Sequence, residues 1–121
     1  MNITQHLLIK LSEECSEISK EALKAVQFGL GNHHPDETRT NNDKLISEFN
    51  DLFAIIEMLN DRLECIENRA SIENKKRKVI KFMKVSVELG LLDHRAYNEW
   101  VEDPDDKVHI DEDLESQHRD Y

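Results

Sequence analysis

Apolar residues recur at helical spacing along most of this chain, and little in the sequence interrupts them. The 121 residues include only three glycines and two prolines, the residues that most often end a helix. Apolar side chains three or four residues apart form a stripe along one face of a helix. The sequence therefore predicts an all-α fold, an antiparallel bundle of three main helices.

The stripes and the breakers set the expected boundaries of these helices. The first runs over residues 3–28, capped by Asn2 or Thr4, and Gly29 and Gly31 end it. The polar run 29–42 then forms a long loop.

The second helix is expected to begin with a cap among residues 40–43 and to end near Asn68. Ser71 is expected to cap the third, which ends near Gly90. After Leu92 the pattern weakens to one or two helical turns.

The chain length fits one domain with an appendage. Residues 1–92 are expected to form the helical domain, and residues 93–121 an acidic C-terminal extension. Most of the net charge of −10 lies after Leu92, so we expect the extension to be a short helix or partly disordered.

Acidic side chains are set into two of the apolar stripes. Glu14 and Glu17 flank the stripe of the first helix, and Glu48 falls inside the stripe of the second, one turn before Asp51. A carboxylate that faces a core is costly unless something pairs with it. At about 6 Å and an effective dielectric constant of about 20, each like-charged pair costs roughly 3 kcal/mol. A Mg²⁺ ion, which prefers oxygen ligands, would relieve this repulsion.

Two further features are compatible with a phosphate-bearing ligand. Lys75 and Lys78 lie in the most concentrated cationic run of the sequence, share a helix face at i, i+3, and can contact phosphate oxygens as point charges. Phe28 follows Glu17 by about three helical turns and can stack on a base. Each also has a structural interpretation, a solvated face for the lysines and a core or interface position for Phe28.

Composition narrows the possible partners and the compartment. The net charge of −10 argues against a general nucleic-acid binder. No apolar run approaches the ~20 residues that a bilayer-spanning helix needs, and the N-terminus lacks the pattern of a signal peptide. The two cysteines have no CxxC spacing and are expected to be free thiols. A cytoplasmic location is therefore expected.

The acidic pattern resembles the signature of a known superfamily. Glu13 and Glu14 followed by Glu17, then Glu48 and Asp51 on the next helix, are similar to the EExxE and ExxD motifs of the MazG-like all-α nucleoside triphosphate pyrophosphohydrolases. The resemblance covers about residues 3–91. The connection between the two motifs is at the long end for this family, which would reshape a nucleoside pocket.

This resemblance implies Mg²⁺-dependent hydrolysis of a ribo- or deoxyribonucleoside triphosphate to the monophosphate and pyrophosphate, with Mn²⁺ as a possible substitute. It implies metal ligands at Glu14, Glu17, Glu48 and Asp51, with Glu17 and Glu48 catalytic and Glu13 supporting. It also implies a homodimer or homotetramer in which helices of neighbouring copies complete the bundle.

Two other classes of protein remain open at this point. One is a non-enzymatic helical interaction module whose acidic tail is the docking element. The other is a di-iron carboxylate protein, disfavoured because Glu115-x-x-His118 lies in the polar tail and not beside an apolar stripe.

Overall fold

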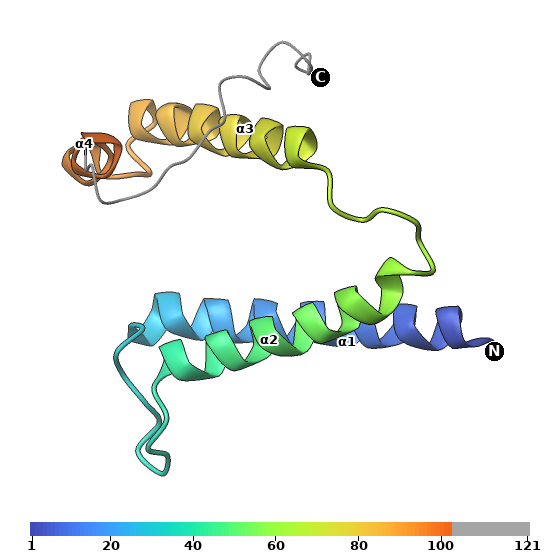
Figure 1. Ribbon diagram of the computed structural model, residues 1–121. Coiled ribbons are helices and arrows are strands. Elements are labelled where there is room, and N and C mark those ends of the chain that lie inside the picture. Colours follow the sequence, from blue (N-terminus) through green and yellow to red (C-terminus); the bar gives the residue numbers. More distant parts are fainter. Residues whose placement is uncertain (103–121) are drawn as a thin grey trace. The chain divides into compact units, whose positions relative to one another are not determined.

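Helices joined by loops make up the part of the chain that the structure describes. The computed structural model describes residues 1–102, and the extension that was expected to be partly disordered lies mainly outside this range. Within residues 1–102 there are four helices and no strand, which confirms the all-α class (Figure 1). The helices are α1 (Ile3–Phe28), α2 (Asn41–Asn60), α3 (Arg69–Glu88) and α4 (His94–Glu102).

The helices belong to two compact units. The first unit, Met1–Ile66, contains α1 and α2, and the second begins at Glu67 and contains α3 and α4. A bundle that joins α3 to α1 and α2, and its completion by other copies of the chain, stay predictions, as does a domain boundary at residue 92.

In the first unit, α1 and α2 lie side by side and antiparallel, as a helical hairpin (Figure 1). Leu7 of α1 and Leu59 of α2 are its buried apolar residues, and Leu45, Leu52 and Ile55 are partly buried. Burying a leucine side chain fully contributes about 2 kcal/mol. The hairpin therefore has a thin apolar core, and the polar groups at the helix interface weigh heavily in its stability.

Both helices of the hairpin begin with a capping box. The Asn2 side chain accepts a hydrogen bond from the backbone N–H of Gln5, whose side chain accepts one in return from the Asn2 N–H. Thr40 and Asp43 make the same reciprocal pair at the start of α2. These bonds satisfy N–H groups that a helix start leaves without partners. Of the two caps expected for the first helix, Asn2 and Thr4, the structure uses Asn2, and the cap expected within residues 40–43 is Thr40.

The connection between α1 and α2 is held by backbone contacts across its base. Gly29 ends α1 with φ of 89°, a left-handed value that favours glycine. The Asn41 side-chain amide donates to the Gly29 carbonyl at 2.8 Å, and the Asn41 backbone N–H donates to the Asn32 carbonyl at 2.8 Å. Asn41 is buried. The start of α2 is thereby fixed against the end of α1.

The predicted end of α2 near Asn68 was wrong, since the helix stops at Asn60. Arg62 reaches the Thr4 hydroxyl in the first turn of α1, at 3.4 Å. A longer α2 would extend past the beginning of its partner and find no surface to pack against. Glu64, with φ of 61°, leaves the helical conformation altogether.

The second unit begins with a different cap from the one expected. Asn68 caps α3 by accepting from the Ser71 backbone N–H at 2.9 Å, so Ser71 is the donor and not the cap. α3 ends at Glu88, and Gly90 follows with φ of 75°. The expected short helical segment near residues 96–101 is α4.

Within residues 1–102, none of the helices combines the length and the hydropathy required to traverse a bilayer.

Replacing Gly29 should destabilise the hairpin, whereas replacing Gly31 should not. A Cβ at Gly29 would require a left-handed φ and would lie 3.2 Å from the Asn32 amide nitrogen, whereas a Cβ at Gly31 meets nothing within 4 Å. We expect Gly29→Ala to lower the free energy of unfolding by about 1–2 kcal/mol and Gly31→Ala to leave it within about 0.5 kcal/mol, as measured by urea denaturation. Equal effects of both substitutions would contradict this account of the connection.

Candidate metal centre

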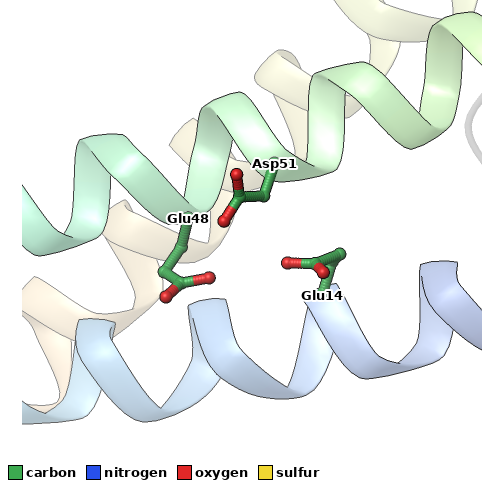
Figure 2. Close-up of side chains that lie close together, drawn as sticks. All are labelled: Glu14, Glu48 and Asp51. Carbon is green, nitrogen blue, oxygen red and sulfur yellow. The ribbon is translucent and has the colours of Figure 1, made fainter.

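Three carboxylates from the two helices of the hairpin meet at its interface. Figure 2 shows Glu14 of α1 opposite Glu48 and Asp51 of α2. One oxygen from each of the three side chains lies within 4.8 Å of the others. Glu14 and Glu48 are partly buried, and Asp51 is exposed. The group is open to solvent on one side and backed by the helix interface on the other.

The local sequence accounts for this arrangement. Glu48 occupies a position in the α2 stripe between Leu45 and Leu52, as its spacing predicted, so packing of the stripe carries its side chain toward α1. Asp51 follows three residues later on the same face. The antiparallel pairing then brings Glu14 opposite both.

Among the described residues, none of these three carboxylates is neutralised by an ion pair. Within residues 1–102, Glu14, Glu48 and Asp51 form no ion pair and no side-chain hydrogen bond. The pKa of Glu48 is raised, first by burial and then by the negative charges of Asp51, Glu17, Glu14 and Glu21. Like charges at this spacing repel, and burial weakens screening by solvent.

A hard divalent cation fits this set of ligands. Mg²⁺ is bound in proteins by one or two carboxylates, with water and phosphate oxygens completing its shell. Three carboxylates that converge on one point, with an exposed side toward solvent, provide such ligands and leave room for others. Mn²⁺ accepts the same oxygen donors.

The structure gathers three of the four expected ligands and leaves Glu17 outside the group. Glu17 is exposed, one turn along α1 from Glu14, and its charge still contributes to the raised pKa of Glu48. Glu13, expected to play a supporting role, is also exposed, and its carboxylate pairs with Lys10 at 3.0 Å. Glu17 is therefore close enough to act on this site electrostatically, while Glu13 is engaged elsewhere.

Glu21 extends the acidic row beyond the residues that the sequence singled out. Its side chain is buried, with 7% of the residue exposed, and Lys24 lies 3.4 Å from its Oε1. Its Oε2 is buried with no hydrogen-bond partner among the described residues. The signal was present in the sequence, because Glu21 follows Glu14 by seven residues and Glu17 by four, on one helical face.

The lysines expected to contact phosphate belong to the second unit. Lys75 is exposed on α3, and Lys78 is partly buried one turn later. Their i, i+3 spacing on one helix is confirmed, and their role toward a ligand stays a prediction.

Phe28 was expected to contact a nucleoside. It lies at the end of α1 next to the connection, where a cavity of about 380 Å³ opens. The ring is 57% exposed, so Phe28 is not a core residue of the hairpin. The cavity is lined by residues of both helices and of their connection: Lys24, Phe28, Asn32, His33, His34, Pro35, Glu37, Asn41 and Lys44. The sequence pattern did not reveal this cavity, which is formed by the path of the connection.

No protein-family model, curated protein or solved structure was found to match this chain. Assignment of a function consequently depends on the geometry of the hairpin and on the motif resemblance.

Removing the charge of Glu48 should stabilise the metal-free protein. At neutral pH the raised pKa means that the ionised carboxylate is disfavoured in the folded state relative to the unfolded state. We expect Glu48→Gln to raise the Tm in the presence of a chelator, whereas Glu57→Gln, an exposed change on the same helix, should leave it unchanged.

The advantage of Glu48→Gln should shrink as the pH falls through the raised pKa of Glu48. The wild-type carboxyl then takes up a proton in the folded state before it does so in the unfolded state, and the repulsion disappears. Thermal unfolding at neutral and mildly acidic pH measures this difference. A lower Tm for Glu48→Gln at neutral pH without metal would contradict the proposed repulsion.

Proposed function

We propose that the protein is a Mg²⁺-dependent nucleoside triphosphate pyrophosphohydrolase, which converts a nucleoside triphosphate to the monophosphate and pyrophosphate. The observation that carries this proposal is the group of three converging carboxylates at the α1–α2 interface, which form no ion pair with any residue in the range 1–102. Their residue types and order along the chain also match the motifs of the MazG-like enzymes. The geometry supports a metal and a phosphate, and the resemblance supplies the bond that is cleaved.

Glu14, Glu48 and Asp51 would hold the cation. Bound Mg²⁺ would neutralise phosphate charge and lower the pKa of a coordinated water. In the reaction the oxygen of water forms a bond to the α-phosphorus, and the bond from that phosphorus to the oxygen of the leaving pyrophosphate breaks.

A carboxylate must orient the attacking water and accept its proton. Glu17 and Glu48 are the two candidates. Glu17 is exposed beside the three ligands and remains available to bind water, whereas Glu48 belongs to the ligand group itself. The two assignments predict different consequences for metal binding.

Cationic side chains would stabilise the negative charge that develops on the leaving pyrophosphate. Lys75 and Lys78 are proposed for this role, as single charges on one face of α3. Within the hairpin, Lys44 lies one turn before Glu48 and now pairs with Glu37. Lys44 is therefore a second candidate source of positive charge, within the same unit as the carboxylates.

Substitution of the two candidate carboxylates should separate metal binding from turnover. We expect Glu48→Gln to abolish both pyrophosphate release and the stabilisation of the protein by Mg²⁺, which for a wild-type site at 100 times its Kd is about 2.7 kcal/mol. Glu17→Gln should reduce turnover by at least about 100-fold, the usual contribution of a general base, and retain most of the Mg²⁺ stabilisation.

The measurement combines thermal shift with a panel of ribo- and deoxyribonucleoside triphosphates, scored for monophosphate and pyrophosphate. Glu57→Gln serves as the control, and circular dichroism verifies that helical content is intact. Full turnover in both the Glu17 and the Glu48 variant would overturn the assignment. Absence of product from every nucleotide, together with absence of a Mg²⁺-dependent shift, would favour a non-enzymatic interaction module.

We propose in addition that the protein works as a homo-oligomer. α2 carries a second apolar stripe on another face, in which Ile46, Phe49 and Phe53 are exposed and the two phenylalanine rings stack with centroids 6.4 Å apart. Burying this exposed apolar stripe against another copy of the chain would remove its side chains from water. It would also add to the small apolar core of the hairpin.

Introducing a charge into this second stripe should dissociate the oligomer. Phe53 is 55% exposed, so a substitution there does not disturb the interior of the hairpin. We expect Phe53→Asp to shift the mass measured by light scattering from a dimer or tetramer to the monomer, while Leu30→Asp, an exposed change in the connection, leaves it unchanged. A wild-type protein that is monomeric at high concentration would refute this part of the proposal.

A further inference from the structure

We propose that the cavity at the connection end of the α1–α2 hairpin binds the nucleobase of the substrate, with Phe28 against the face of the ring and His33 and His34 at its edge. This inference rests on the proposed function, because it assigns the substrate's base to a cavity in the same unit as the carboxylates. The three carboxylates would hold the metal and, through it, the phosphates, so recognition of the base requires a separate site.

The size and the lining of the cavity suit a planar, partly apolar ring. Its volume of about 380 Å³ is within the range of small-molecule sites. Phe28 and Pro35 provide apolar surface, and the other lining residues are polar or charged side chains of the connection and the adjoining helix ends. An exposed aromatic face stacks on any base, since every base has a π-surface.

The cavity and the three carboxylates lie one after the other along the same two helices, α1 and α2. On α2, Lys44 lines the cavity and precedes Glu48 by four residues, a rise of about 6 Å. On α1, Lys24 lines the cavity and pairs with Glu21, the buried end of the acidic row. The order from carboxylates through lysines to aromatic ring matches the order of metal, phosphates and base in a metal-bound nucleotide.

The two histidines present a hydrogen-bond acceptor and a donor. His33 Nδ1 lies 2.8 Å from the His34 carbonyl, which can only accept, so Nδ1 carries the hydrogen and Nε2 of the neutral ring is an acceptor. His34 Nδ1 accepts from the Asp36 backbone N–H at 3.2 Å, so its Nε2 carries the hydrogen and is a donor. Adjacent donors and acceptors are what the hydrogen-bonding edge of a nucleobase requires.

The connection is organised well enough to hold these groups in place. Asn32 donates its side-chain amide to the Phe28 carbonyl, and its own carbonyl accepts from the Asn41 N–H. Glu37 pairs with Lys44, which ties the middle of the connection to α2. A pre-formed site loses less conformational entropy when a ligand binds.

The test separates the base from the phosphates by using probes that carry only one of them. The full chain, labelled with ¹⁵N, is titrated with each common nucleoside without metal, and separately with inorganic tripolyphosphate and Mg²⁺. We expect at least one nucleoside to shift the amide signals of residues 28–41. In Phe28→Ala the affinity for that nucleoside should fall on the order of tenfold, while binding of Mg²⁺-tripolyphosphate, which has no base to stack, should be unchanged.

Matched substitutions guard against non-specific effects. Phe82→Ala removes a ring that is 66% exposed on α3, outside the cavity, and should leave nucleoside binding unchanged. The double variant His33→Ala/His34→Ala should bind all nucleosides with nearly equal affinity, because the groups that read the edge are gone. His6→Ala, an exposed histidine of α1, should preserve the wild-type preference.

The outcomes distinguish failure of this inference from failure of the proposed function. If no nucleoside shifts residues 28–41, or if Phe28→Ala binds nucleosides as well as wild type, the nucleobase site is rejected even when the enzyme hydrolyses nucleotides. If nucleosides bind in the cavity but no nucleotide is hydrolysed, the base site stands and the pyrophosphohydrolase activity fails.

Discussion

Mutual repulsion of carboxylates across the α1–α2 interface limits the stability of the hairpin. Glu14 and Glu48 are partly buried where a helix pair would normally place apolar or paired side chains, and the exposed Asp51 lies beside them. Glu21 adds a buried oxygen that has no hydrogen-bond partner within residues 1–102. The buried leucines of the hairpin, Leu7 and Leu59, contribute only a small stabilisation to offset this repulsion. A sequence that keeps four acids in such a place gives up stability that neutral residues would supply. The raised pKa of Glu48 shows the same effect at one residue, because burial and the neighbouring negative charges disfavour its ionised form.

Much of the architecture was readable from periodicity. The bounds of α1, the capping residues of α1 and α2 and the placement of Glu48 within its stripe followed from helical spacing and cap chemistry alone, because these are local properties of the chain. The convergence of Glu14 with Glu48 and Asp51 also followed, once two striped helices joined by a loop were paired antiparallel. Glu17 was expected among the ligands but lies beside them, one helical turn from Glu14. Helical spacing places Glu14 and Glu17 on the same face and does not distinguish which of them faces α2.

The remainder depended on contacts between distant residues. The early end of α2 is set by where α1 begins, through Arg62 and Thr4, and no pattern within residues 60–68 indicates it. The cavity exists because Asn41 closes the base of the connection against Gly29, which gathers Phe28, His33 and His34 on one side. The polar composition of residues 29–42 predicted a loop, and only the path of this loop reveals the cavity.

The compactness of the hairpin in sequence has a consequence for the way the chain is made. All the groups assigned to the cation and to the ring lie between Glu14 and Asp51, joined by contacts among nearby segments. Folds dominated by contacts between nearby segments assemble quickly, and chains emerge from the ribosome N-terminus first, at about 5–20 residues per second. Because α1 and α2 leave the ribosome first, the hairpin can begin to fold, and to meet a divalent cation, while α3 and α4 are still emerging.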